Sequence, residues 1–402
     1  MSTKIRAEPI LAYPPNIADL DELAPYRTAL ESALGMAATA GNKVDILQNG
    51  EQIFPAMLEA IGGARDRVDF LTYVYWTGDI ARKFAGALAA KARSGVSVNV
   101  LLDAFGCKKM PAQLVEELQA SGVNLRWFRP LSRWRFWQND NRTHRKILVV
   151  DNCIGFTGGV GIADEWTGGG QDPNHWRDTH FRFEGAAVMG LKAAFLDNWN
   201  EAGPWEQDDL PDQTQYRERG IDVQVVRASS TIGWTETASL LRALLSVARD
   251  SLQIVTPYFV PDPGLQHLLS DAAARGVQVE IMFPGEHCDM RLSQLAGHKS
   301  VLPLLEHGAR IWRYERTMLH TKLVLVDNIV ACVGSANFNH RSLGKDEECC
   351  AVLYSRATTR RLIEAFREDQ QYASELRASS WQNRGSWLKC QESLARLLLH
   401  EL

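Results

Sequence analysis

The chain has 402 residues, of which 45% are hydrophobic and 23% are charged. This content of apolar side chains supports large buried cores and excludes disordered and fibrous proteins. With 44 Lys and Arg residues against 48 Asp and Glu residues, the net charge is −4, which argues against a protein that coats nucleic acid through an overall basic surface.

The length and the cysteine content further restrict the kind of protein that this chain can be. At roughly 100–200 residues per domain, the length predicts two domains or two halves of one large domain. No apolar stretch approaches the ~20 residues that span a bilayer, and the N-terminus lacks the apolar core of a secretion signal. The seven scattered cysteines contain no Cys-x-x-Cys pair, so we expect reduced thiols in the cytoplasm and neither a disulfide framework nor a bound metal.

The order of predicted elements is repeated along the chain. A helical segment, a short strand, a helix that ends at Gly95 and a second short strand follow one another in the first half. The same order returns in the second half, where the corresponding helix ends at Gly276. Helical periodicity that alternates with short β-branched runs predicts an α/β fold with helices packed on a sheet. The expected strands are residues 68–74, 96–102, 252–258 and 277–282.

A second repeat is more specific. The pattern His-x-Lys-x-x-x-x-Asp occurs at residues 144–151 and returns at residues 320–327. A glycine-led turn follows each copy at the same distance, at Gly158 and at Gly334. These repeats, with a segment rich in polar and turn residues between them, divide the chain into an N-terminal extension over 1–40, a first repeat over 41–205, a linker over 206–222 and a second repeat with C-terminal helices over 223–402.

The doubled motif offers paired reactive side chains. Residues two apart on a strand project to the same face, so His144 and Lys146 point together, as do His320 and Lys322. If the halves pack about an approximate two-fold axis, the four side chains converge on one anion. One histidine then attacks phosphorus, the other protonates the leaving oxygen, and the lysines neutralise the non-bridging oxygens. A covalent phosphohistidine results, which a second alcohol or water resolves.

This chemistry needs one neutral and one protonated histidine, and a carboxylate behind each ring can fix its tautomer and support its charge. Asp178 and Glu348 are the candidates, because each follows the histidine of its own copy at a similar distance along the chain. The two acids directly before Glu348, Asp346 and Glu347, are alternatives to it.

Two more acids, Asp151 and Asp327, belong to the candidate site because they close the two motifs. Their odd spacing from the histidines makes them face away from those rings on an ideal strand. We therefore expect structural hydrogen bonding from them more than chemistry.

The paired motifs resemble those of the phospholipase D superfamily. Their amino-acid sequences are similar to those of its bacterial cardiolipin synthase branch. The resemblance covers about residues 45–370. It rests on residues 128–131 (Phe-Arg-Pro-Leu), residues 142–146 (Arg-Thr-His-Arg-Lys) and residues 334–343 (Gly-Ser-Ala-Asn-Phe-Asn-His-Arg-Ser-Leu). The resemblance implies two repeated phospholipase D-like units, each a mixed β-sheet flanked by helices. It also implies that they pack as a pseudo-two-fold dimer with one active site at the interface.

The resemblance also implies a two-step phosphatidyl transfer that uses no metal and no other cofactor. In this family the histidine of the N-terminal half is more often the nucleophile. That role therefore falls to His144 and the acid–base role to His320, and the exchanged assignment stays open.

Two departures from the family pattern concern the phosphate. The Ser-x-Asn that the family carries after the first motif is Gly-Val-Gly at residues 159–161. Ser335 and Asn337 of the second half are therefore expected to bind more of the phosphate, with Gly159 as the counterpart in the first half. Asp346 stands where the family has Asn, which adds negative charge near an anionic lipid.

A basic and aromatic segment surrounds the start of the first motif. Between residues 126 and 146, seven basic and five aromatic side chains are interleaved with a single acid. Such a mixture favours the headgroup level of a bilayer. A solvated loop whose rings pack on the core, or a stacking platform for single-stranded nucleic acid, gives the same pattern. The proposed membrane or substrate contacts are Arg129, Arg133, Trp134, Arg135 and Trp137.

We therefore expect a phosphatidyltransferase, a cardiolipin synthase that acts on phosphatidylglycerol through a covalent phosphatidyl-histidine. Its expected partner is an anionic phospholipid, met at the inner face of the cell membrane by a peripheral cytoplasmic protein, and no nucleic acid is expected. The alternatives are a phospholipase D that uses water, a metal-independent phosphodiester nuclease and a non-enzymatic lipid-binding scaffold.

Overall fold

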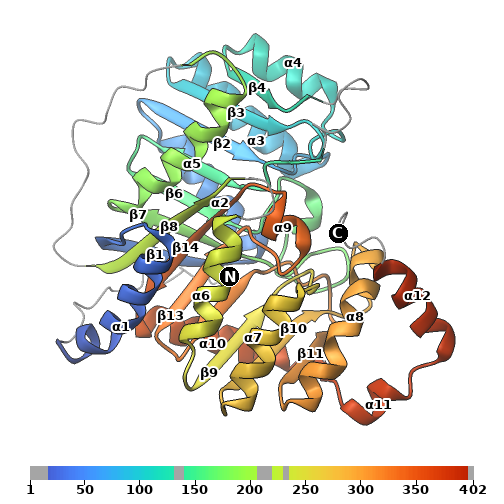
Figure 1. The fold of residues 1–402 in the computed structure, drawn as a ribbon. Helices are drawn as coiled ribbons and strands as arrows, with labels where there is room; N and C mark the ends of the chain where they lie inside the picture. The colour runs from blue at the N-terminus through green and yellow to red at the C-terminus, as the bar shows by residue number, and fades with distance from the viewer. Residues whose placement is uncertain (1–16, 131–139, 206–219, 230–234, 397–402) are drawn as a thin grey trace, which may run out of the picture.

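The computed structural model describes residues 17–130, 140–205, 220–229 and 235–396. Two lobes lie one above the other in Figure 1. Most of the first half of the chain, from blue to green, forms the upper lobe, and the second half, from yellow to red, forms the lower lobe, beside which α1 (Ile17–Leu34) also lies. A single sheet of 15 strands runs through both lobes.

The first half alternates helices and strands up to a hairpin region and then closes with a long helix. Its elements are α1 (Ile17–Leu34), β1 (Thr39–Gln48), α2 (Asn49–Gly63), β2 (Arg67–Thr72), α3 (Asp79–Arg93), β3 (Ser97–Asp103), α4 (Ala112–Ala120), β4 (Asn124–Phe128), β5 (Ile147–Val150), β6 (Ile154–Gly158), the 3-10 turn η2 (Asp164–Trp166), β7 (Thr179–Glu184) and α5 (Ala187–Glu201).

The second half follows the same plan and adds a C-terminal extension. Its elements are β8 (Ile221–Ala228), α6 (Glu236–Val247), β9 (Ser251–Val255), α7 (Pro263–Ala274), β10 (Gln278–Pro284), α8 (Arg291–Glu306), β11 (Arg310–Tyr314), β12 (Leu323–Val326), β13 (Val330–Gly334), α9 (His340–Gly344), β14 (Glu348–Tyr354), α10 (Arg356–Gln370), β15 (Ala373–Glu375), α11 (Ala378–Gln382) and α12 (Ser386–Arg396).

The two halves share one strand order. From the centre outward, the first half reads β1-β7-β6-β5-β2-β3-β4, and the second reads β8-β14-β13-β12-β9-β10-β11 with β15 at its outer edge. β1 and β8 pair antiparallel where the halves meet. β2, β3 and β4 run parallel, as do β9, β10 and β11. The expected repeat of α/β units is confirmed, with the four expected strands present as β2, β3, β9 and β10.

Alternate residues of the hairpin strands enter different cores. In β5, Leu148 and Val150 pack into a core of the first half, whereas Ile147 and Val149 point to the other face of the sheet. β12 repeats this alternation with a core of the second half. The core on the other face contains α5 and α10 with strands of both halves, so burial of apolar surface there holds the halves together.

Matching tight turns close the two motif hairpins. Asp151 and Asn152 have φ angles of 50° and 53°, and Asp327 and Asn328 have φ angles of 51° and 56°. Two successive positive φ angles are what a type I′ hairpin turn requires, and Asp and Asn tolerate them. The turns fix the register of both hairpins, and with it the position of the residues that precede β5 and β12.

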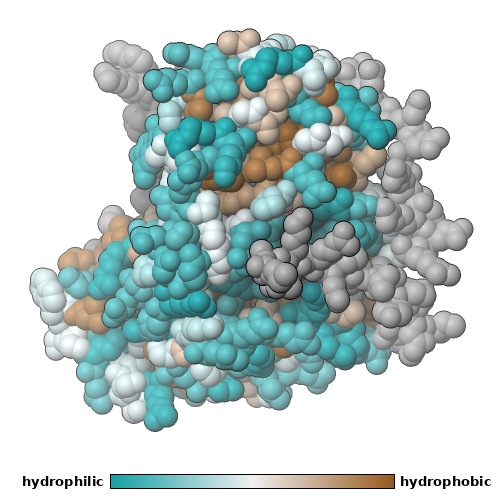
Figure 2. All heavy atoms as spheres, turned by 180° about the vertical axis from the view of Figure 1, so that it is seen from behind, coloured by the Kyte–Doolittle hydropathy of each residue, from teal (hydrophilic) through white to brown (hydrophobic). Residues whose placement is uncertain are grey.

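None of the described helices is both long enough and apolar enough to cross a bilayer. Seen from behind, the surface is mostly hydrophilic, with a hydrophobic area in the upper lobe (Figure 2). The linker expected over 206–222 lies mostly outside the described residues, and the division of the chain at residues 40, 205 and 222 stays a prediction.

Candidate active site

Both motif histidines lie directly before a hairpin, His144 before β5 and His320 before β12. Because β5 is antiparallel to β2 and β12 to β9, each histidine lies at the carboxyl end of the parallel strands of its half. Backbone hydrogen bonds cross between the halves at this point. The amide of His144 donates to the carbonyl of Glu347 at 2.8 Å, and the amide of His320 donates to the carbonyl of Arg177 at 2.7 Å.

The two histidine–carboxylate pairs cross between the halves. The Nδ1 atom of His144 lies 3.1 Å from both carboxylate oxygens of Glu348, which belongs to the second half. The Nδ1 atom of His320 lies 2.8 Å from Oδ2 of Asp178, which belongs to the first half. All four side chains are buried. Neither half alone therefore contains a complete histidine–carboxylate pair. Neither carboxylate contacts Nε2 of its ring, and Nζ of Lys322 lies 3.3 Å from Nε2 of His320.

The motif lysines are buried in the same cluster. Nζ of Lys146 donates to the carbonyl of His144 at 2.7 Å, and Nζ of Lys322 donates to that of His320 at 2.6 Å. Burial and the ammonium group of Lys322 lower the pKa of Lys146 to about 7. Burial also lowers the pKa of Lys322 to about 8, against the opposing effect of nearby carboxylates. Two buried ammonium groups in one low-dielectric cluster favour an anionic ligand.

Burial acts on the histidines and carboxylates in opposite ways. It lowers the pKa of both histidines, and for His320, where Lys322 adds to burial, to about 3. Burial alone would raise the pKa of each carboxyl group, but the facing histidine and lysine outweigh it. The pKa of Glu348 therefore falls to about 2, and that of Asp178 also lies below its ordinary value. Both carboxylates are ionised at neutral pH and hold their rings by charged hydrogen bonds.

Different donors hold the two carboxylates. The hydroxyl of Ser335 donates to Oε2 of Glu348 at 2.5 Å, and that of Ser342 donates to Oε1 at 2.6 Å. In the first half, Nε1 of Trp166 donates to Oδ2 of Asp178 at 2.9 Å, and a backbone amide donates to Oδ1 at 2.8 Å. Trp166 and Ser342 follow the histidines of their own motifs at the same distance along the chain. The indole N–H therefore takes the place of a hydroxyl.

The three residues expected to bind phosphate differ in whether their side chains have partners within the protein. A Cβ atom on Gly159 would lie 2.3 Å from Oδ1 of Asp178, so the shorter acid fills the space of the missing side chain. Ser335 is buried and its hydroxyl is engaged by Glu348. Asn337 is buried, and within the described residues its Oδ1 has no hydrogen-bond partner. Their role in phosphate binding stays a prediction.

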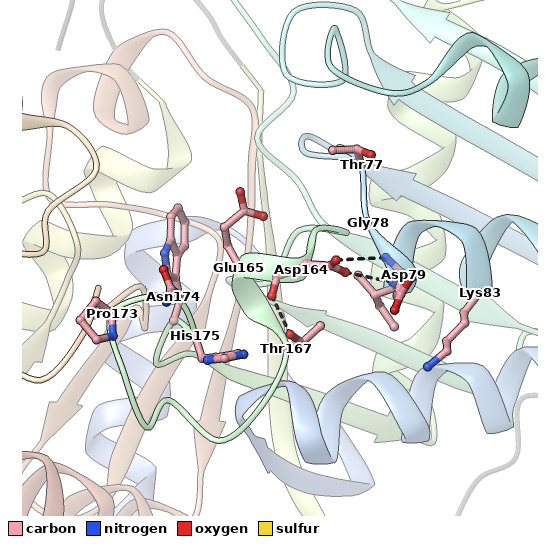
Figure 3. Close-up of a pocket in the computed structure, with 12 residues that line it drawn as sticks. Thr77, Gly78, Asp79, Lys83, Asp164, Glu165, Thr167, Pro173, Asn174 and His175 are labelled. Atoms are coloured by element: carbon pink, nitrogen blue, oxygen red, sulfur yellow. Dashed lines mark hydrogen bonds between the residues drawn. The ribbon is translucent and has the colours of Figure 1, made fainter.

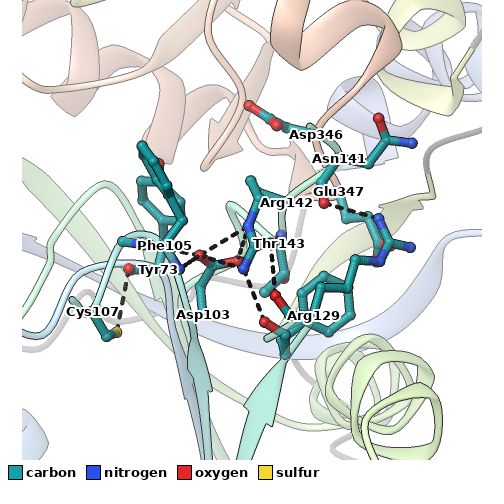
Figure 4. A network of polar contacts seen from close by, with 12 residues as sticks. Tyr73, Asp103, Phe105, Cys107, Arg129, Asn141, Arg142, Thr143, Asp346 and Glu347 are labelled. Carbon is teal, nitrogen blue, oxygen red and sulfur yellow. Dashed lines mark hydrogen bonds and ion pairs between the residues drawn. The ribbon is translucent and has the colours of Figure 1, made fainter. Parts of the chain in front are cut away.

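A buried polar network anchors the segment before His144 (Figure 4). Arg142 pairs with Asp103 at the end of β3, with 3.0 Å between Nε and Oδ2. Arg129 pairs with Glu201 at 2.6 Å and with Glu347 at 3.2 Å. The guanidinium of Arg129 is thus engaged within the protein, which does not support the expected membrane contact. The other expected contacts, Arg133, Trp134, Arg135 and Trp137, lie outside the described residues.

Asp346 and Glu347, the alternatives to Glu348, are paired with arginines. Two contacts at 2.7 Å and 3.2 Å join the carboxylate of Asp346 to the guanidinium of Arg341, and Glu347 belongs to the network of Figure 4. Asp346 still acts on the site, because its charge raises the pKa of His144 against the larger effect of burial.

The motif acids lie at the other ends of β5 and β12, so they leave the catalytic set. Asp151 accepts hydrogen bonds from three successive backbone amides, those of residues 65–67, at 2.8–2.9 Å. Asp327 accepts from the amides of residues 249–251 at 2.7–2.9 Å and from the hydroxyl of Tyr26 at 2.7 Å. Their role is to tie each hairpin turn to the start of the neighbouring strand.

Aromatic rings cover the two histidines unequally. The rings of Trp166 and Trp176 lie against His320, with centroid distances of 5.2 Å and 5.5 Å. Tyr73 lies against His144 at 5.1 Å. His320 therefore has two tryptophans around it, which exclude water more fully than one tyrosine does.

A pocket of about 670 Å³ adjoins Trp176, which forms part of its wall (Figure 3). The figure shows how the turn η2 is fixed beside it. The carboxylate of Asp164 accepts hydrogen bonds from the amides of Asp79 and Ile80 at the start of α3, at 3.0 Å and 3.1 Å. This cap holds the turn that carries Trp166.

Sequence reasoning does not identify several functional side chains, namely Tyr73, Trp166, Trp176, Arg341 and Ser342. The repeat spacing alone is enough to match Trp166 with Ser342. The others are found only from contacts in the folded chain, of which that of Trp176 with His320 crosses between the halves. Within the described ranges, no three His, Cys, Asp or Glu side chains are placed to hold a metal ion together.

Comparison with known sequences covers both halves. The family described as "Cardiolipin synthase, PLD-like domain" matches residues 57–168 and 241–370. Cardiolipin synthase 1 of Bacillus cereus is 33% identical over 364 residues, which cover 88% of this chain and 71% of that protein. The major cardiolipin synthase of Bacillus subtilis strain 168 is 30% identical over 368 residues, covering 90% of this chain and 75% of that protein.

Comparison with solved structures supports the fold. The phosphatidylserine synthase of Haemophilus influenzae Rd KW20 matches 94% of this chain and 100% of its own, with a TM-score of 0.69 and 14% sequence identity. The polyphosphate kinase of Porphyromonas gingivalis matches 84% of this chain and 49% of its own, with a TM-score of 0.55 and 14% sequence identity. The duplicated arrangement of two α/β units around one sheet is thus found in other proteins.

Proposed function

The chain belongs to the cardiolipin synthase family with phospholipase D-like domains, and we propose that it makes cardiolipin from phosphatidylglycerol. It is a phosphatidyltransferase of the phospholipase D type. In the proposed reaction, the phosphatidyl group of one phosphatidylglycerol passes to a hydroxyl of a second one, and glycerol is released.

The observation that carries this proposal is the crossed arrangement of two histidine–carboxylate pairs around two ammonium groups. Asp178 and Glu348 fix the Nδ1 side of the two rings, which leaves Nε2 of each ring for the substrate. One Nε2 attacks phosphorus while the other protonates the leaving glycerol oxygen. In the second step the roles reverse, because the deprotonated ring takes the proton of the acceptor hydroxyl.

Lys146 and Lys322 stabilise the charge that gathers on the non-bridging oxygens. An ammonium group is most effective where water is excluded, and both lysines are buried. Asn337 is proposed to add a hydrogen bond to the phosphate, because rotation of its buried amide turns the NH2 group toward the unpartnered position. Ser335 then acts through Glu348, whose carboxylate it holds.

The test uses pure protein, phosphatidylglycerol vesicles and a chelator. Mass spectrometry should detect cardiolipin and glycerol in equal amounts, and His144→Ala and His320→Ala should each abolish turnover. His267→Ala serves as the control, since His267 is exposed on α7. Absence of both cardiolipin and phosphatidic acid would reject the proposal, as would near-normal rates in either variant of the site. Phosphatidic acid alone would favour the phospholipase alternative.

We also propose peripheral contact with the inner face of the cell membrane. Phe105 follows β3, and Met290 and Leu292 follow β10, so all three lie at the carboxyl ends of the parallel strands, where the site lies. Each is an exposed apolar side chain. Lys108 lies 4.7 Å from the ring of Phe105, which suits an anionic surface.

A further inference from the structure

The two histidines have unequal surroundings, although the motifs around them are repeated. The inequality begins in three positions where the halves differ. Trp166 stands in place of Ser342, since each follows its motif histidine at the same distance. Asp178 corresponds to Glu348, and the residues two positions before them, Trp176 and Asp346, correspond in turn. The first difference replaces a hydroxyl by an indole beside His320, and the third places a carboxylate in the first histidine's surroundings where the other histidine has a tryptophan.

His320 lies in surroundings that oppose a proton on its ring. Nζ of Lys322 lies 3.1 Å from Nδ1 and 3.3 Å from Nε2 of that ring. Trp166 and Trp176 cover the ring, so solvent does not screen the ammonium charge. Asp178 faces this ring with one carboxylate oxygen, Oδ2, which also accepts the indole N–H of Trp166. In agreement, the pKa of His320 falls to about 3.

His144 has more acidic groups around it than His320 has, although burial still lowers the pKa of His144 below its ordinary value. Both oxygens of Glu348 are 3.1 Å from its Nδ1 atom. Asp346 corresponds along the chain to Trp176, and its charge opposes, without outweighing, the burial that lowers the pKa of His144. Arg341 holds that carboxylate in place and offsets part of its charge. Both lysines donate to the carbonyl of their own motif histidine, and Lys322 in addition lies 3.1 Å and 3.3 Å from the two ring nitrogens of His320.

We propose that His320 is the nucleophile and His144 the general acid and base, the reverse of the assignment that the resemblance favours. This inference rests on the proposed function. The lone pair of Nε2 of His320 attacks phosphorus, and the bond from phosphorus to the glycerol oxygen breaks. That oxygen takes the proton from Nε2 of His144, and glycerol leaves. Asp178 accepts the hydrogen bond from Nδ1–H of the phosphorylated His320 ring.

The second step restores the enzyme. Neutral His144 takes the proton of the acceptor hydroxyl at Nε2, and the acceptor oxygen attacks phosphorus. The bond between phosphorus and nitrogen breaks, and its electron pair returns to Nε2 of His320. Charge and atoms therefore balance over the cycle without any further reactant.

A substrate whose leaving group needs no acid separates the two roles. With a short-chain phosphatidyl-p-nitrophenol, a variant that lacks the general acid can still form the covalent adduct, because nitrophenolate is a good leaving group. That variant then stalls, since no base activates the acceptor. We expect His144→Ala to release a stoichiometric burst of nitrophenolate and to carry the phosphatidyl group on the peptide that contains His320. We expect no burst from His320→Ala.

Controls keep the outcomes apart. His144→Asn and His320→Asn repeat the comparison with side chains of more similar size, and circular dichroism checks that each variant is folded. A burst from the His320 variants with an adduct on His144, or no burst from the His144 variants, would overturn the assignment. Failure of the wild-type protein to release nitrophenolate at all would instead overturn the proposed function.

Discussion

At the scale of single residues, the site is asymmetric because Gly159 and Asp178 are matched to one another, as Ser335 and Glu348 are. The Asp side chain is one methylene shorter than Glu, so its carboxylate lies close to the backbone where the serine would be. A Cβ atom on Gly159 would meet Oδ1 of Asp178 at 2.3 Å. The serine of one half therefore cannot simply be copied into the other.

Gly159→Ser tests this match. The added side chain should displace Asp178 and with it the ring of His320, and a shift of about 1 Å in a catalytic group costs about 10²-fold in rate. Gly86→Ser is the matched control, because a Cβ atom on Gly86 meets nothing within 4 Å. Steady-state kinetics should show a large loss of kcat for the first variant and none for the second. Equal rates would show that Asp178 is not confined by Gly159.

The depressed pKa of Lys146 predicts a pH dependence. With a pKa of about 7, against about 8 for Lys322, its ammonium loses its proton at a lower pH than an ordinary lysine does. The value of kcat/KM for the wild-type enzyme should therefore fall as pH rises through neutrality. Lys146→Ala should lose ~10²–10³ in rate, and its alkaline decline should move toward the pKa of Lys322. A flat profile across the alkaline range would contradict the clustered ammonium groups.

Lys299→Ala provides the control for this experiment. Lys299 is exposed on α8, so its removal changes the net charge by the same amount without touching the site. Its profile should match that of the wild-type enzyme.

At the scale of elements, the motif hairpins are held by the acids that close the motifs. Asp327 is buried and accepts four hydrogen bonds, one of them from Tyr26. Asp151 accepts three, two of which are exposed. Buried charged acceptors are costly to remove because their donors lose their partners.

We expect Asp327→Ala to lower the free energy of unfolding by about 3 kcal/mol and Asp151→Ala by about half of that. Urea denaturation measures both. The turnover number per folded molecule should stay near the wild-type value at low temperature, since both acids lie at the far ends of β5 and β12 from the histidines. Loss of activity without loss of stability would return these acids to the catalytic set.

Many of the strands and both His-x-Lys pairs can be predicted from the sequence. The repeated helix and strand periodicities predict β2, β3, β9 and β10, because alternation within a short segment is a local signal. The His-x-Lys pairs are local signals of the same kind. The pairing of His144 with Glu348, and of His320 with Asp178, joins positions far apart along the chain and in different halves, so local patterns do not contain it.

Local sequence patterns also do not reveal the role of a residue that differs from its equivalent in the other half. A tryptophan that replaces a serine hydroxyl as donor, as Trp166 does, looks like a core residue in the sequence. Arg129 looks like part of a basic surface patch, and its ion pairs with Glu201 and Glu347, which join the two halves, are not visible in the sequence. Long-range partners decide such roles, whereas composition shows only that charged and aromatic residues are present.

At the scale of the whole molecule, the two halves join through β1 and β8 into one sheet. Exposed apolar residues, among them Phe105 and Leu292, follow strands at the same edge of that sheet as the site. Phe105→Asp and Leu292→Asp should weaken binding to phosphatidylglycerol vesicles and lower the rate on vesicles, because apolar area and attraction to the anionic surface both decrease. The rate on a soluble short-chain substrate should stay unchanged. Vesicle sedimentation and parallel assays check this.

The control places the same charge elsewhere. Gln119 is exposed near the end of α4, before β4 begins and therefore at the opposite edge of the sheet. Gln119→Asp should leave vesicle binding intact. If all three variants bind vesicles like the wild-type protein, the membrane contact lies elsewhere on the molecule.

The central claim is that two histidines act in turn on one phosphorus atom, and the stereochemical course tests it most directly. A phosphorothioate analogue of phosphatidylglycerol, chiral at phosphorus, would be transferred to ethanol and the configuration of the product determined. Two successive in-line displacements each invert phosphorus, so the account predicts overall retention of configuration. Overall inversion would mean a single direct displacement without a phosphatidyl-histidine, and it would contradict the account.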